Sequence, residues 1–131
     1  MFAIKRSHIR LLVINFKPCF CFYRDKLELP LRYGQEDGVY AEFKTEGLHI
    51  ALFKRNLMAE VLGTEHKQSE SDVQDRQVLI LRVDKVDEAY NYLVQKGVTF
   101  ETPPLDRKEW ECRTAHFRDP EGNLWELNAD L

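Results

Sequence analysis

The sequence has 131 residues, of which 44% are hydrophobic and 31% charged, and its formal net charge at pH 7 is -3. This length and composition are typical of a folded globule and exclude a disordered chain, so we expect residues 1–131 to form a single domain. The small negative charge gives no electrostatic reason to expect nucleic acid or a membrane surface as a partner.

The N-terminal segment and the cysteines indicate a cytoplasmic protein. Charged residues interrupt the first apolar stretch, MFAIKRSHIRLLVIN, which also lacks the small-residue cleavage site of a signal peptide. No apolar run approaches the roughly 20 residues that a membrane-spanning helix needs. The three cysteines, Cys19, Cys21 and Cys112, show no CxxC spacing, and we interpret them as reduced thiols.

The first half of the chain contains strand patterns around one helix. Apolar residues recur at helical spacing from Pro18 to Leu27, which predicts a helix there. Alternating apolar and polar residues predict strands at about Lys5–Ile14, Leu31–Gln35, Val39–Lys44 and Leu48–Phe53. This first module covers about 1–54. A polar linker follows at about 55–75, with a short helix that ends at Gly63.

The second half, about 76–131, repeats this order. A strand at Gln77–Val83 precedes a helix at Val86–Lys96, and three further strands are predicted at Val98–Thr102, Trp110–Phe117 and Asn123–Asn128. The letters repeat too, because Ala41–Phe53 aligns with Ala115–Asn128. Each half is therefore predicted to be β-α-β-β-β, as an internal duplication would leave it.

One carboxylate, Glu126, lies among apolar neighbours in the last predicted strand, although ionised carboxylates are seldom buried without a partner. In that strand Trp125 and Leu127 point to the face opposite Glu126, and in the first strand His8 and Arg10 oppose an apolar face. We expect the apolar faces to lie under the helices and the mixed faces to line a cavity.

Four segments in this order resemble the vicinal oxygen chelate superfamily of glyoxalases, bleomycin-resistance proteins and extradiol dioxygenases: HIRLLVIN at 8–15, FYRDKLELPL at 22–31, LRVDKVDEAYNYLVQKGV at 81–98 and FRDPEGNLWEL at 117–127. The resemblance implies an α+β fold in which two β-α-β-β-β modules form a half-open barrel around a ligand cavity. It also implies a homodimer, since exposed strand edges are usually covered.

The resemblance also implies where a divalent metal would bind. Metal-using members have ligands at the positions of His8, Val78 and Glu126, and a valine cannot ligate a metal. Two ligands make a poor catalytic site, which normally has three and an open position. His116 is expected on the same face and could supply the third ligand for zinc, nickel, manganese or iron.

Other residues are expected on the cavity face by their parity along the strands. Arg10 could bind an anionic group of a ligand through bidentate hydrogen bonds from its guanidinium. Alternatively, Glu126 could form an ion pair with His8 or with Arg10. We interpret Cys112 as a buried thiol and not as a nucleophile. The full set of expected ligand-binding residues is Arg10, Glu42, Phe53, Val78, Trp110, Cys112, Thr114 and His116.

Two functional hypotheses follow. The first is a cavity that binds a small organic molecule with no cofactor, as metal-free members of the resembled family do. The second is a metal-dependent lyase, isomerase, thiol transferase or dioxygenase that uses His8, Glu126 and His116. Val78 favours the first, and whether the protein is an enzyme stays open. If it is one, Glu126 and His116 are the candidate catalytic residues.

Overall fold

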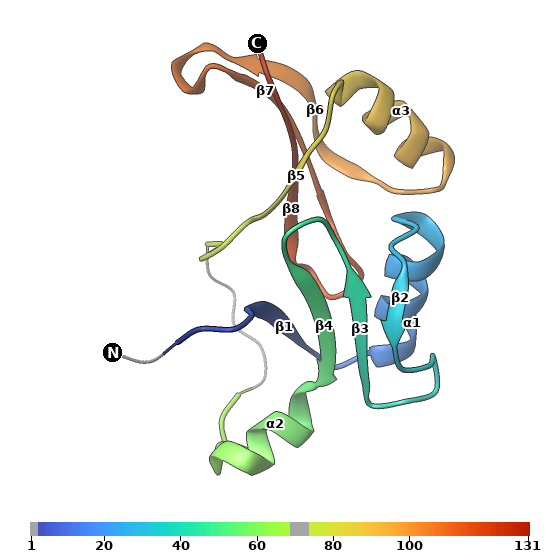
Figure 1. The fold of residues 1–131 in the computed structure, drawn as a ribbon, viewed down its shortest axis with the longest axis vertical. Coiled ribbons are helices and arrows are strands. Elements are labelled where there is room, and N and C mark those ends of the chain that lie inside the picture. The colour runs from blue at the N-terminus through green and yellow to red at the C-terminus, as the bar shows by residue number, and fades with distance from the viewer. Residues whose placement is uncertain (1–2, 69–73) are drawn as a thin grey trace. The chain divides into compact units, whose positions relative to one another are not determined.

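A computed structural model describes residues 3–68 and 74–131 (Figure 1). The chain divides into two compact units, Met1–Asp72 and Val73–Leu131, which we call unit 1 and unit 2. No helix in the described ranges is long and apolar enough to cross a membrane.

Unit 1 contains one four-stranded sheet in the order β1-β4-β3-β2, in which β1 runs parallel to β4 and the other pairs are antiparallel. Helix α1 and the π-helix η1 connect β1 to β2, and α2 follows β4 (Figure 1). The elements are β1 (His8–Val13), α1 (Phe16–Cys21), η1 (Phe22–Lys26), β2 (Leu31–Tyr33), β3 (Tyr40–Lys44), β4 (His49–Lys54) and α2 (Arg55–Leu62).

Unit 2 repeats this topology with the order β5-β8-β7-β6, and β5 runs parallel to β8. The elements are β5 (Leu79–Arg82), α3 (Val86–Gln95), β6 (Phe100–Arg107), the 3-10 helix η2 (Lys108–Trp110), β7 (Cys112–Arg118) and β8 (Leu124–Asp130). The predicted α+β fold of two β-α-β-β-β modules is therefore confirmed.

The core of each unit lies between its helix and one face of its sheet. In unit 1 the rings of Phe20 and Tyr23 pack on Phe43, with centroids 5.3 and 5.9 Å from it. In unit 2 Trp125 stacks on Phe117 at 6.2 Å. Each of these rings is almost fully buried, and burying one contributes about 1.5–3 kcal/mol. The core position predicted for the last tryptophan is confirmed.

The helix boundaries follow from local chemistry. Gly63 ends α2 with φ of 68°, and the amides of Gly63 and Thr64 bond back to the carbonyls of Glu60 and Ala59, as predicted for a glycine stop. Helix α1 starts at Phe16, which places Pro18 in the first helical turn. Proline is tolerated there because the amide groups of the first turn have no intrahelical partner, so its missing N–H costs no hydrogen bond.

Several predicted boundaries differ from those of the structure. β1 starts at His8 instead of Lys5, and the helix expected to end at Leu27 becomes a π-helix from Phe22, whose carbonyl accepts the Leu27 amide at 3.1 Å. β6 continues through two prolines, which is possible because it is an edge strand with register shifts. β7 starts at Cys112. In the expected linker, α2 takes up the first part, and residues 69–73 lie outside the described residues.

Candidate functional site

Each sheet has a polar face opposite the face that packs on its helix, and we call it the open face. In unit 1 every second residue along β1, β4 and β3 points to it. Burial alternates along β1 and β3, whereas β4 lies inside the sheet and is buried on both faces from Ile50 to Leu52. The register places these residues in three rows: His8, His49 and Lys44; Arg10, Ala51 and Glu42; Leu12, Phe53 and Tyr40.

Glu42 is the carboxylate of the unit 1 open face. Its Oε1 accepts a hydrogen bond from the Tyr40 hydroxyl at 2.7 Å, and its Oε2 lies 3.3 Å from Nε of Arg32. The bond from Tyr40, followed by the positive charges of Arg32, Arg6 and His8, lowers the pKa of Glu42, while partial burial opposes this. Burial on this face raises the pKa of Tyr40, and the hydrogen bond that its hydroxyl donates to Glu42 raises it further.

Arg10 extends over the aromatic row of the same face. Its guanidinium carbon lies 5.3 Å from the ring centroid of Tyr40 and 5.5 Å from that of Phe53. A guanidinium stacked on two rings is held in place, and Arg10 also donates a hydrogen bond to the Tyr40 hydroxyl, which leaves its other N–H donors for a ligand. The structure thus brings together Arg10, Glu42 and Phe53, three of the residues expected on the cavity face.

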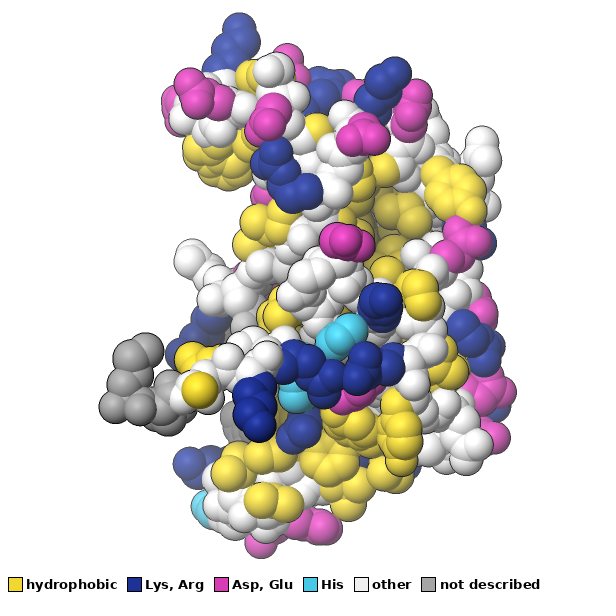
Figure 2. Space-filling model, viewed as in Figure 1, with side chains coloured by type: hydrophobic (Ala, Val, Ile, Leu, Met, Phe, Trp, Pro, Cys, Tyr) yellow, Lys and Arg dark blue, Asp and Glu magenta, His cyan; other side chains and the backbone are white. Residues whose placement is uncertain are grey.

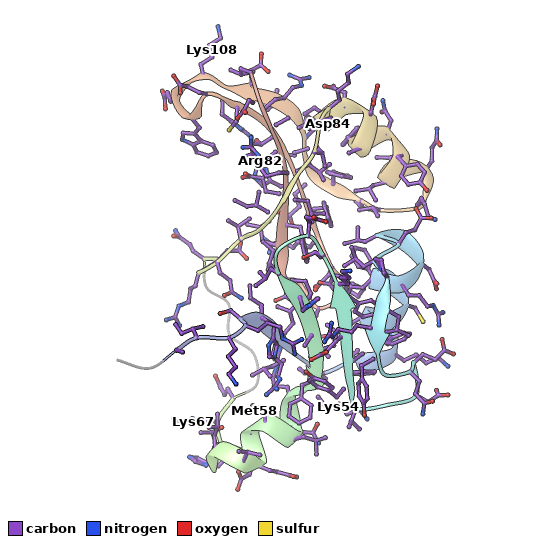
Figure 3. All side chains as sticks on the ribbon, in the orientation of Figure 1. Lys54, Met58, Lys67, Arg82, Asp84 and Lys108 are labelled. Atoms are coloured by element: carbon purple, nitrogen blue, oxygen red, sulfur yellow. The ribbon has the colours of Figure 1, made fainter. Side chains whose placement is uncertain are left out.

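A cavity of about 510 Å³ opens beside this face, between α2 and the end of β1. The surface of its walls is mainly apolar, although Arg55, Glu65 and Lys67 also line it. Leu12 belongs both to the cavity and to the open face. Met58 lines it from α2 and Lys67 from the segment after α2 (Figure 3). Apolar volume of this kind suits the body of a small organic molecule.

Glu126 has two partners on the open face of unit 2, which answers the question that its burial raises. Its Oε1 lies 2.9 Å from Nε2 of His116, the residue directly opposite it on β7. Its Oε2 accepts a hydrogen bond from the amide nitrogen of Asn128 at 2.7 Å. Glu126 is only 7% exposed, so these bonds replace water at both oxygens of its carboxylate.

The bonds continue outward from this pair at both ends. Nδ1 of His116 lies 2.7 Å from the Thr102 hydroxyl. Arg82, on β5 (Figure 3), donates to the side-chain oxygen of Asn128 at 2.7 Å and to Asp130 at 2.8 Å. Because arginine only donates and an ionised carboxylate only accepts, both ends of the Asn128 amide are assigned. An ionised Glu126 likewise accepts a hydrogen bond, so Nε2 of His116 carries a proton and donates it to this bond. In a neutral imidazole Nδ1 then accepts a hydrogen bond from the Thr102 hydroxyl.

Cys112 and Thr114 lie on the same open face, as predicted, and both are buried. The sulfur of Cys112 accepts from the Asn128 amide at 3.6 Å, and the hydroxyl of Thr114 accepts from Arg107 at 3.1 Å. Trp110 differs from expectation. It lies in η2 and not in a strand, is 62% exposed, and has Arg107 5.9 Å from its ring.

The side chains of unit 2 that could ligate a metal beside Glu126 are engaged in hydrogen bonds, and the neighbouring residues on β5 are aliphatic. Ile80, not a ligand, is the register neighbour of Glu126 on β5, and Val78 precedes the strand. Both oxygens of Glu126 are bonded, and Nε2 of His116 is bonded to one of them. Across the part of the chain that the structure describes, no three His, Cys, Asp or Glu side chains group as a metal site.

The sequence carried one signal for the His116–Glu126 pair. The turn between β7 and β8 is closed by Asp119, whose carboxylate accepts the amides of Glu121 and Asn123 at 2.9 Å. Positions at equal distances from the centre of this turn face each other, which places His116 opposite Glu126. The bonding roles of Tyr40, Thr102, Arg82 and Asn128 were not predicted, because each depends on rotamers and on pairing across strands.

Comparison with known families identifies the class of protein. Residues 5–127 match the family model of the Glyoxalase/Bleomycin resistance protein/Dioxygenase superfamily, and the chain therefore belongs to this superfamily. It is 44% identical over 124 residues to YraH of Bacillus subtilis (strain 168), described as an uncharacterized protein, with 95% of this chain and 97% of YraH covered.

Solved structures share the fold. A glyoxalase/bleomycin resistance protein/dioxygenase from Nocardioides has a TM-score of 0.77 at 24% identity, covering 99% of this chain and 87% of its own. The genomically encoded fosfomycin resistance protein FosX from Listeria monocytogenes has a TM-score of 0.71 at 20% identity, covering 99% and 96%.

Proposed function

We propose that this protein binds a small organic molecule against the open face of a sheet, without a resident metal ion. The observation that carries the proposal is the hydrogen bonding of Glu126, whose two oxygens are held by His116 and Asn128. The mainly apolar cavity under α2 supports the small-molecule part, because it offers apolar volume next to polar groups.

A metal at Glu126 would have to compete with these bonds. The imidazole nitrogen that could ligate, Nε2 of His116, is the one that faces the carboxylate at 2.9 Å. Binding there requires loss of the proton between them and separation of the pair, at a free-energy cost that bulk water does not impose. The aliphatic side chains of Val78 and Ile80 offer no ligand in return.

The pair can still act on a bound molecule. Glu126 and Thr102 each bond to one ring nitrogen of His116 and so fix the orientation of its imidazole. A fixed orientation of this kind is typical of a histidine that acts as a general acid or base. If the protein is an enzyme, proton transfer by His116 and Glu126 is the chemistry these residues favour. A protein of the same fold does bind a metal, since a FosX variant from Listeria monocytogenes has been crystallised with manganese and a dihydroxypropylphosphonic acid.

The test is the metal content of protein purified without chelators, followed by calorimetry with zinc, nickel and manganese. We expect no stoichiometric metal and weak binding of all three ions. One tightly bound ion per chain that is lost in Glu126→Gln would overturn the proposal. If His116→Gln also abolished that binding, the metal-dependent alternative with His8, Glu126 and His116 would be right.

A gain of ligand sharpens this test. Ile80→His introduces an imidazole at the register neighbour of Glu126, and Val78→His introduces one at the position the family resemblance indicates. We expect whichever of the two variants places its histidine closer to Glu126 to raise the affinity for zinc about tenfold. Combining each variant with Glu126→Gln should remove the gain, and a gain that survives would show that Glu126 is not involved.

We also propose a homodimer. Each sheet, taken by itself, ends in two edge strands, β1 and β2 in unit 1 and β5 and β6 in unit 2. Exposed edges are usually covered in stable proteins. Light scattering at micromolar concentration should give twice the mass of the chain, and the mass of a single chain would contradict this.

A further inference from the structure

The open face of unit 1 gathers positive charge around one carboxylate. Figure 2 shows lysine or arginine and histidine side chains side by side over β1 and β4. Arg6, Arg32 and His8 act electrostatically on Glu42, and the register adds Arg10, Lys44 and His49 to the same face. Four of these side chains are permanent cations, although the whole chain has a net charge of -3.

This gathering contrasts with the other arginines of the chain. Arg24, Arg113 and Arg118 each lie within 3.0 Å of two carboxylates. Among the described residues, Arg10 has no ion pair within 4.0 Å and is instead held over the rings of Tyr40 and Phe53. Cations left unpaired beside one another repel, and an anion placed among them relieves that repulsion.

His49 adds an unsatisfied group to this face. Its Nδ1 is buried and has no hydrogen-bond partner among the described residues. A buried polar atom without a partner destabilises a fold and calls for an explanation, of which an absent ligand is one. His49 lies directly between His8 and Lys44 in the sheet, so it belongs to the cationic group.

We propose that the open face of unit 1 binds the anionic group of a small organic acid, a carboxylate, phosphate or phosphonate, with Arg10 as its principal contact. Arg10 suits this role because its planar guanidinium can donate two parallel hydrogen bonds to such a group. The inference rests on the proposed function, since the acid is the small molecule proposed above.

The arrangement also places the rest of the ligand. Leu12 follows Arg10 on the same face of β1 and lines the apolar cavity under α2. An acid whose charged end contacts Arg10 can therefore direct an apolar body toward Leu12 and Met58. The ligand class is an amphiphilic organic acid, not a bare inorganic ion.

Glu42 sets the sign of a decisive test. It is the single carboxylate of the three rows of this face, and Arg32 lies 3.3 Å from it. Replacing it by glutamine keeps the size and removes the negative charge, so an anionic ligand should bind more tightly. A ligand that bound as a cation, or through apolar contacts alone, would bind more weakly or unchanged.

The experiment compares benzoate with benzamide, its neutral analogue of similar shape, by calorimetry on the full chain in chelator-containing buffer. We expect benzoate to bind at millimolar concentration and at least about tenfold more tightly than benzamide. Arg10→Gln should weaken benzoate about tenfold and leave benzamide unchanged, and Glu42→Gln should tighten benzoate several-fold. Circular dichroism of each variant checks that it folds.

Arg24→Gln is the matched control, because it removes an arginine of the same unit that already pairs with Asp25 and Glu36. Equal effects of Arg10→Gln and Arg24→Gln, equal binding of benzoate and benzamide, or no binding of benzoate would each overturn the inference. Equal binding of both probes would leave the proposed function standing. A tight metal bound through Glu126 would instead refute the proposed function while benzoate binding at Arg10 persisted.

Discussion

The two open faces share one topology and differ in how their charges are satisfied. The row Arg10, Ala51 and Glu42 in unit 1 has the same place in its sheet as the row Ile80, Glu126 and His116 in unit 2. In unit 2 the carboxylate and the imidazole bond to each other. In unit 1 an alanine, Ala51, has the place that Glu126 has in unit 2, so the residue next to Arg10 in its row is not a carboxylate, and Glu42 lies one strand further away.

This difference separates two roles that a duplicated scaffold can take. The polar groups of unit 2 are satisfied internally from Thr102 to Asp130, and such a network favours one fixed arrangement. In unit 1, Arg10 is held by ring contacts and not by a counter-charge. We therefore expect substitutions in the network around Glu126 to cost the most stability, and substitution of Arg10 to affect ligand binding more than stability.

The largest effect is expected for His116→Leu. The change leaves one oxygen of the buried Glu126 against an aliphatic side chain, and we expect the free energy of unfolding to fall by about 3 kcal/mol in urea titrations. Adding Glu126→Leu should recover most of the loss, because removing both partners leaves no unsatisfied charge. A loss below about 1 kcal/mol would contradict the internal satisfaction of unit 2.

Asn128→Leu should cost less, about 2 kcal/mol, since Glu126 keeps its bond to His116. The change removes a donor to the carboxylate and the acceptor of Arg82. Arg82→Gln is the control, because it removes only the exposed end of the network and should cost under about 1 kcal/mol. Equal losses for the two variants would show that the network has no buried centre.

In unit 1, Tyr40→Phe should cost about 1.5 kcal/mol at neutral pH, because Glu42 loses the hydrogen bond that most lowers its pKa. A lowered pKa in the folded state stabilises the protein above the pKa of the unfolded state, and this stabilisation is lost as pH falls through the folded value. Thermal unfolding from pH 7 down to pH 3 should therefore show the two proteins converging in acid. A difference that stays constant would exclude Glu42 as the cause.

The sequence predicted much of the open faces, because alternation along a strand decides which residues share a face. His8 with Arg10, and Glu126 with His116 and Thr114, follow this period of two. The prediction that Trp110 lies in a strand is wrong, because Glu111, with a φ of 58°, turns the chain immediately before β7 begins. No glycine marks that turn in the sequence.

Partners were harder to predict than faces. The sequence left Glu126 with His8 or Arg10 as a possible ion-pair partner, while its bonds within unit 2 come from the register of the β7–β8 hairpin. Register depends on turn geometry as well as on pattern. The contact of Arg10 with the rings of Tyr40 and Phe53 depends on the pairing of β1 with β4 and of β4 with β3. No local sequence pattern encodes this pairing.

The smallest effect is expected for Arg10→Gln without ligand, a change within about 0.5 kcal/mol of the wild type. The loss of contacts with the rings of Tyr40 and Phe53 amounts to about 0.5–1 kcal/mol at an exposed site, and relief of repulsion from the other cations of the face offsets it. Because salt screens that repulsion, added sodium chloride should stabilise the wild type slightly more than the variant. Urea unfolding at low and high salt measures both quantities. A loss above about 1.5 kcal/mol would show that Arg10 is bound by the fold itself, and the two open faces would then not differ in the way that their charges suggest.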